Sequence, residues 1–171
     1  MLRRFFKSQT GSTAVEFAIV GVPFVFALIG LCELSLMYAA NSVLQESTTS
    51  AARTIRTGQA QKSGGSAEEV FRDELCRSAS VFLDCARIQY EVVGLQNGFS
   101  DAGSNPATFD SNGNLQNTGF DPPGSDQVVL IRTAYNYPLM TPLIGSVMSD
   151  GPNQTKRMVS TVILQTEPYE F

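Results

Sequence analysis

A long apolar run near the N-terminus constrains this chain more than any other feature. From Phe17 to Leu31 the sequence reads FAIVGVPFVFALIGL, fifteen residues without a polar side chain. Because a helix that crosses a bilayer needs about 20 mostly apolar residues, the stretch from about 14 to 40 predicts a single membrane span. Its polar interruptions are few, chiefly Glu16, Cys32, Glu33 and Ser35.

The charges before this run predict its orientation. Residues 1–10 carry Arg3, Arg4 and Lys7 and no acidic side chain. A basic flank stays on the cytoplasmic side of a membrane. We therefore expect a cytoplasmic N-terminus, one span of the inner membrane, and a domain after residue 40 that lies outside it.

The overall composition excludes several classes of function. The 171 residues carry 12 Lys and Arg against 16 Asp and Glu, a formal net charge of -4, and no His. An acidic chain does not attract phosphate backbones, so we expect no nucleic-acid partner. Without His there is no His-based triad or His metal ligand, and three Cys cannot form a four-thiolate zinc site. We expect no catalytic residues, no metal and no cofactor.

Other interpretations of the N-terminus fit less well. A secretory signal would be cut near residues 37–40, where a bulky residue stands at the −3 position, and lipidation of Cys32 fails because Leu31 precedes it. Arg3 and Arg4 match only the start of a twin-arginine signal. A plain anchor stays open, but it leaves Glu16 unexplained. A charged side chain costs about 2.5–3.5 kcal/mol at the centre of a spanning helix and less near the interface.

The residues around Glu16 form a motif that accounts for it. Residues 11–17 read G-S-T-A-V-E-F, in which Glu is the fifth residue after a Gly that ends a basic leader. This resembles the processing site of type IV pilin-like prepilins, and the Glu-Phe pair of Glu16 and Phe17 resembles the Tad/Flp branch. The resemblance implies that a prepilin peptidase cuts between Gly11 and Ser12.

The spacing has a physical reason under this interpretation. Gly11 has no side chain to block a protease from the backbone, and the cut leaves an α-amino group on Ser12 that is largely positive at neutral pH. That amine, in the same chain or a neighbouring subunit, can neutralise Glu16, which links burial of the carboxylate to assembly. Glu33 lies roughly 100° around the helix from Glu16, and we expect it at the periplasmic interface.

The rest of the chain predicts an α+β head. Residues 41–57 continue in helical register, so the N-terminal helix is expected over 12–57, with Gly58 as a stop. The sequence Ser66-Ala67-Glu68-Glu69 is a capping box that starts a short helix ending near Ser78. Residues 87–93, 127–137 and 157–166 alternate like strands. We expect a leader at 1–11, the helix, and a head over 58–171 with an antiparallel sheet of three or four strands.

Two further features belong to the head. Cys76 and Cys85 both lie outside the membrane in this topology and are expected to form a disulfide in an oxidising periplasm. Cys32 is left over in the span and is expected to be a small buried residue. Residues 97–126 are rich in Gly, Asn, Ser, Asp and Pro and predict a flexible loop. Asp110, Asn112 and Asn114 imitate the start of a calcium loop, but Gly113 and Asp121 depart from its pattern.

The whole pattern is similar to the TadE-like family of minor pseudopilins. Besides the processing motif, the softer matches are Ala51-Ala52-Arg53, Thr57-Gly58-Gln59, the Cys pair before a strand, Tyr137-Pro138, Thr141-Pro142-Leu143 and Glu167-Pro168-Tyr169. The resemblance implies a pilin-like protein that is no enzyme and that assembles a Tad/Flp pilus for surface adherence. Its implied partners are the prepilin peptidase, other Tad minor pseudopilins, the major Flp pilin and the inner-membrane assembly platform, with incorporation into the extracellular pilus as a further expectation.

Two alternative functions stay open. An unprocessed single-span protein of the inner membrane could carry a periplasmic domain that binds or senses a ligand. A membrane-anchored hydrolase ranks behind it, because the sequence has no G-x-S-x-G nucleophile motif and no His. The N-terminal sequence of the protein recovered from membranes distinguishes the processed pseudopilin from an unprocessed protein.

Overall fold

The computed structural model describes residues 12–62, 66–121 and 124–169. Its largest element is α2, a 45-residue helix over Ser12–Arg56 that continues through Pro23. The long N-terminal helix of the predicted fold class is thus confirmed, and it ends at Arg56. Gly58, two residues after the end of the helix, has a φ of +69°. This left-handed conformation suits a residue without Cβ, and it commonly ends a helix. At about 1.5 Å per residue the helix is roughly 67 Å long.

The head is built around a four-stranded sheet. Its strands are β1 (Gln89–Leu95), β2 (Gly119–Phe120), β3 (Val128–Pro138) and β4 (Thr155–Gln165), in the order β2-β1-β3-β4. The pairs β1–β3 and β3–β4 are antiparallel, whereas β2 runs parallel to β1. The α+β class is confirmed. The sheet is mixed rather than wholly antiparallel, because a two-residue strand from the 97–126 segment joins its edge.

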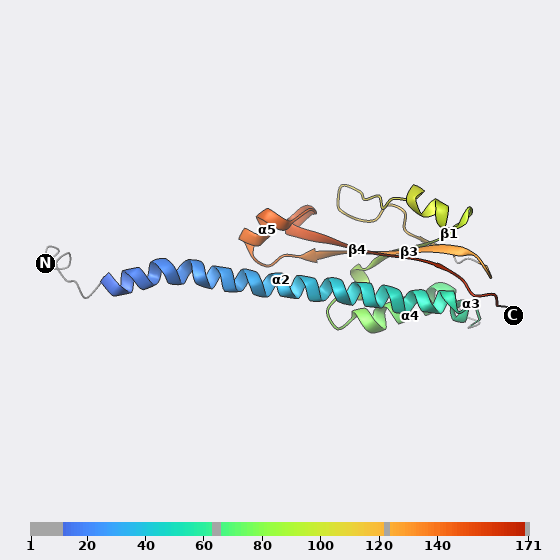
Figure 1. The fold of residues 1–171 in the computed structure, drawn as a ribbon, viewed down its shortest axis with the longest axis horizontal. Helices are drawn as coiled ribbons and strands as arrows, with labels where there is room; N and C mark the ends of the chain where they lie inside the picture. Colours follow the sequence, from blue (N-terminus) through green and yellow to red (C-terminus); the bar gives the residue numbers. More distant parts are fainter. Residues whose placement is uncertain (1–11, 63–65, 122–123, 170–171) are drawn as a thin grey trace.

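Two helices cover one face of this sheet (Figure 1). The second half of α2 packs against β3 and β4, and also against α4 (Ala67–Ala79). Phe71 of α4 contacts the rings of Tyr90 in β1 and Phe120 in β2, with centroids 5.5 and 5.7 Å apart. The buried core between these elements includes Leu44, Ala51, Ile55, Phe71, Leu75, Val92, Val129 and Ile131.

The start of α4 differs from the prediction. Ser66 is the N-cap residue, but its side chain makes no capping hydrogen bond, so the predicted capping box does not form. Its carbonyl instead accepts the N–H of Val70 at 3.3 Å. Glu68, in the first turn, accepts a hydrogen bond from the Tyr90 hydroxyl at 2.7 Å. Burial and this carboxylate raise the pKa of Tyr90 to about 12.

The segment predicted as a flexible loop carries several short elements. They are the 3-10 helix η3 (Gly98–Ser104), an isolated bridge between Phe109 and Leu115, and the edge strand β2. Arg132 of β3 is almost fully buried beneath it, where its guanidinium pairs with Glu91 at 2.7 Å and donates to the Asn105 carbonyl at 2.6 Å. These bonds attach the segment to the sheet through side chains whose pairing the sequence pattern did not reveal.

Candidate functional site: the exposed helix and its junction with the head

The predicted processing motif lies at the start of α2. Gly11 falls outside the described residues, whereas Ser12 begins the helix. Glu16 is exposed and Phe17 is 78% exposed. The Phe17 ring lies over Gly21 one turn later, 3.6 Å from where a Cβ on Gly21 would stand. Glu16 and Phe17 are therefore presented side by side on a helix surface that the head does not cover.

The uncovered part of α2 extends well beyond the motif. Residues 13–29 are exposed, apart from half-buried Gly21, and burial by the head begins at Gly30. Figure 1 shows this part of the helix projecting beyond the head. Large apolar side chains cover it, among them Ile19, Val20, Phe24, Phe26, Leu28 and Ile29. Exposure of such a surface to water would be strongly unfavourable. We therefore expect lipid or other apolar helices to cover it.

Length and composition agree with a membrane span. Among the described residues, α2 is the one helix long and apolar enough to cross a membrane. This fits a single-span membrane protein with its apolar segment near the N-terminus. Cys32, which we expected to be buried, is exposed on the helix surface. It is small enough and apolar enough to face lipid.

Glu33 has a role that the sequence did not indicate. Its side chain is buried, and its carboxylate accepts the backbone N–H groups of Met140 and of Thr141, the latter at 3.0 Å. Thr141 is the N-cap residue of α5 (Pro142–Met148), which follows β3. We expected Glu33 at an interface with water. The structure instead uses it to join α2 to the connection between β3 and β4.

A close helix approach reinforces this junction. A Cβ placed on Gly30 would lie 3.3 Å from Cδ1 of Ile144 in α5, so the absence of a side chain at Gly30 lets α5 lie against α2. Ile144 and Met148 both pack against the core of the head. In the sequence, Gly30 stands three residues before Glu33. This spacing was a signal of a close contact, but it did not identify α5 as the partner.

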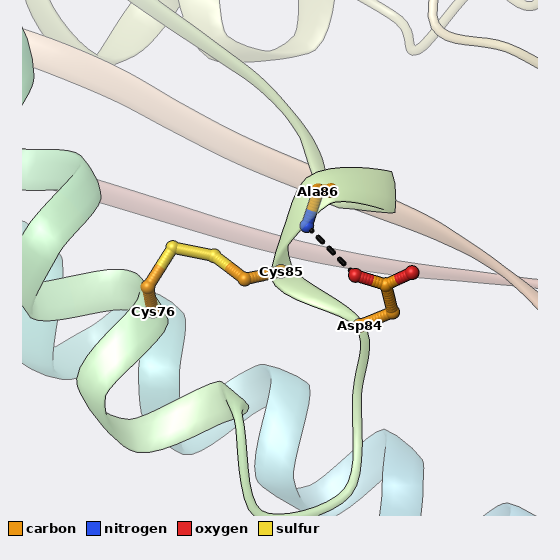
Figure 2. Close-up of a disulfide and its surroundings, with 4 residues drawn as sticks. All are labelled: Cys76, Asp84, Cys85 and Ala86. Atoms are coloured by element: carbon orange, nitrogen blue, oxygen red, sulfur yellow. Dashed lines mark hydrogen bonds between the residues drawn. A yellow bond between two sulfur atoms is a disulfide. The ribbon is translucent and has the colours of Figure 1, made fainter.

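The predicted disulfide forms a separate feature of the head. Cys76, in α4, is bonded to Cys85, the first residue of the 3-10 helix η2 (Cys85–Arg87). Figure 2 shows that Asp84 caps η2, with its carboxylate accepting the N–H of Ala86 at 3.1 Å. The structure does not bring this pair together with Glu16, because Glu16 lies on the projecting part of α2.

The calcium-like residues form a local turn. The Asp110 carboxylate accepts the N–H groups of Asn112 and Asn114, at 2.9 and 2.7 Å. The bond from Asn114 is the main cause that lowers the pKa of Asp110. Within the described ranges, no three His, Cys, Asp or Glu side chains are grouped in a way that could hold a metal ion.

Comparison with known proteins gives one family. Residues 11–53 match the family model described as TadE-like protein, which is the family that the sequence resembles. The matched segment starts at Gly11 of the predicted processing motif, contains the exposed part of α2 and ends within the part that packs on the head. No curated protein and no solved structure matches the chain.

Proposed function

We propose that this chain is a minor pseudopilin that a prepilin peptidase cuts between Gly11 and Ser12 and that then takes part in assembling a Tad/Flp-type pilus for surface adherence. The observation that carries this proposal is the extent of the family match. It runs over residues 11–53 and so covers both the predicted processing motif and most of the long helix. The TadE-like family suggests involvement in the Tad pilus and is not an enzyme family.

The structure supports an assembly role for the first half of α2. Residues 13–29 present an apolar surface that the chain's own head leaves uncovered, as an assembly helix requires. After cleavage the mature chain would hold 9 basic against 16 acidic side chains, because Arg3, Arg4 and Lys7 leave with the leader. The leader's charge serves the orientation of the precursor in the membrane.

Glu16 is the residue that we propose to couple pairing to assembly. It is exposed at the start of the apolar surface, where a neighbouring subunit can reach it. The α-amine of Ser12 in that neighbour would neutralise the carboxylate as both enter an apolar environment. A subunit without this carboxylate would lose a contact that selects the register of the two helices.

The proposed location follows from the orientation that the basic leader gives the precursor. The N-terminus would lie in the cytoplasm and the head in the periplasm, where the Cys76–Cys85 disulfide is stable. The expected partners are the prepilin peptidase, other Tad minor pseudopilins, the major Flp pilin and the inner-membrane assembly platform, with no cofactor. Incorporation into the extracellular pilus follows if the subunit remains in the fibre.

N-terminal sequencing tests the proposal directly. The full chain is expressed with and without a Tad-type prepilin peptidase and recovered from membranes. We expect a new N-terminus at Ser12 when the peptidase is present, and loss of this product in Gly11→Ala. Gly21→Ala is the matched control and should be processed normally, because a Cβ there meets the Phe17 ring at an ordinary contact distance of 3.6 Å.

The alternative function predicts the opposite result. If the protein keeps its original N-terminus with active peptidase, and Gly11→Ala behaves like the wild type, the processing proposal is wrong. The chain would then be an unprocessed membrane protein whose head binds or senses a ligand.

A further inference from the structure

Helix α5 presents apolar side chains on two faces that lie about 100° apart around its axis. Ile144 and Met148, one turn apart, pack against the core of the head. Leu143 and Val147, also one turn apart, point outward and are 63% and 79% exposed. Met140, just before the helix, is 76% exposed. From Leu139 to Ser149 the chain has no charged residue, so the outer face of α5 lacks the composition of a surface that faces water.

The junction with α2 fixes the position of this face along the helix. Ile144 lies against Gly30, and the Glu33 carboxylate binds the N–H groups at the start of α5. Residues 30–33 of α2 are therefore at the level of α5. In Figure 1, α5 lies at the end of the head nearest the uncovered part of α2.

The length of the uncovered helix places that level at the edge of a bilayer. Residues 13–29 number seventeen, which at 1.5 Å each span about 25 Å. The hydrocarbon core of a typical bilayer is about 30 Å thick. A helix that enters the core near Thr13 therefore leaves it about three or four residues after Ile29, at the level of Gly30 to Glu33, where α5 is attached.

The surface of α2 at this level matches a membrane boundary. Leu31 is 61% exposed, so the apolar surface of the helix reaches the level of Gly30 to Glu33, and Leu36, within one turn of Glu33, is 45% exposed. Tyr38, 65% exposed, lies between one and two turns beyond Glu33, and tyrosine is enriched where a membrane meets water. Glu33 itself is buried between α2 and α5, which shields its carboxylate from lipid.

We propose that the outer face of α5, formed by Met140, Leu143 and Val147, inserts into the interfacial region of the outer leaflet and holds the head against the membrane that α2 crosses. A lipid surface is favoured over a second protein subunit for two reasons. Met140, at one end of this face, is hydrogen-bonded to Glu33 of α2. The face also lies at the level where a helix that enters near Thr13 leaves the hydrocarbon core. The inference rests on the proposed membrane placement of α2, and the experiment is designed to test the two separately.

Depth-dependent quenching tests the inference on the full chain. Single Cys residues are introduced at Leu143 or Val147 in a Cys32→Ser background, labelled with an environment-sensitive fluorophore, and reconstituted in phosphatidylethanolamine–phosphatidylglycerol vesicles. Bromine in the upper part of the acyl chains is the quencher for the probes at residues 99, 143 and 147. Bromine near the chain ends is the quencher for residue 22, which lies close to the bilayer midplane if α2 enters the hydrocarbon core near Thr13. Val22→Cys, in the exposed helix, tests the span. Phe99→Cys is the matched control for an exposed apolar residue of the head, because Phe99 is 57% exposed and follows Gly98, which lies beside Val128 at the opposite end of β3.

We expect bromine to quench the probes at residues 143 and 147 several-fold more than the probe at residue 99. If the probe at residue 22 is not quenched, the membrane placement itself is wrong, and the inference falls with it. If residue 22 is quenched but residues 143 and 147 behave like residue 99, the placement stands and the inference is wrong. Protection at residue 143 from both bromine and aqueous iodide would also overturn it, because a second subunit would then cover α5.

Discussion

The carboxylate of Glu33, in the apolar part of α2, accepts the backbone N–H of Thr141 at 3.0 Å, across 108 positions of sequence. The same carboxylate accepts the N–H of Met140. An acid that sequence alone places inside a membrane span is thus hydrogen-bonded to the head of its own chain. It fixes α5 to the helix at the level where the covered part of α2 begins.

Glu33→Ala should loosen the attachment of α5. The substitution removes the acceptor of two backbone N–H groups, and a buried donor left unsatisfied costs about 1–3 kcal/mol. Hydrogen exchange of the Met140 and Thr141 amides, measured on the full chain in detergent, should become faster. Glu46→Ala is the control, because Glu46 is an exposed acid of the same helix. Unchanged exchange in Glu33→Ala would contradict the role assigned to this carboxylate.

The contact between α2 and α4 should depend on pH through Glu74. The Ser50 hydroxyl of α2, and then Arg77, lower the pKa of Glu74 below its usual 4.5. A lowered pKa stabilises the fold above the unfolded-state value, and this stability is lost as the pH falls through the folded-state value. The wild type should therefore unfold at a higher temperature than Glu74→Gln at pH 7, and the difference should shrink below about pH 4.5.

Thermal unfolding followed by circular dichroism in detergent measures this difference. Glu69→Gln, an exposed acid on the same helix, should change the midpoint little at either pH. If the difference in unfolding midpoint between the wild type and Glu74→Gln is the same at pH 7 and below about pH 4.5, the carboxylate charge does not stabilise this contact.

Removal of the disulfide should destabilise the head. Cys76 and Cys85 are nine positions apart, and closing so short a loop contributes somewhat under about 3 kcal/mol in the chain-entropy model. Replacing both by Ser should lower the unfolding midpoint and make it insensitive to a reductant, whereas the wild type should lose stability when reduced. Cys32→Ser, which leaves the disulfide intact, should behave like the wild type. Equal stability of the double variant and the wild type would refute this contribution.

Loss of the Glu16 charge should separate processing from assembly. Glu16→Gln keeps the size of the side chain and leaves Gly11 and Ser12 unchanged, so cleavage should continue. It cannot attract the α-amine of a neighbour, so the amount of this subunit in the assembled pilus machinery, and of pili sheared from cells, should fall strongly. Glu46→Gln should leave both unchanged. Normal pilus formation by Glu16→Gln would remove the pairing argument.

Much of the fold could be predicted because its signals are local. The apolar run and its helical continuation predicted α2 to within one residue of its observed end at Arg56. The alternating runs predicted β1, β3 and β4 within about two residues at each end, because a half-buried strand has a period of two. The short β2 was missed, since two residues carry no detectable period.

The candidate site divides in the same way. The amino-acid sequence by itself determined the long apolar helix, the acid near its start and the family motif, because each depends on neighbouring residues and their helical spacing. Only the tertiary structure decided where Glu33 points, since its partners are reached through the whole path from α2 to the end of β3. It also left Ser66 without its predicted side-chain cap and placed α5 against α2, with Ile144 beside Gly30. These outcomes depend on packing between distant segments, and no local pattern of residues determines such packing.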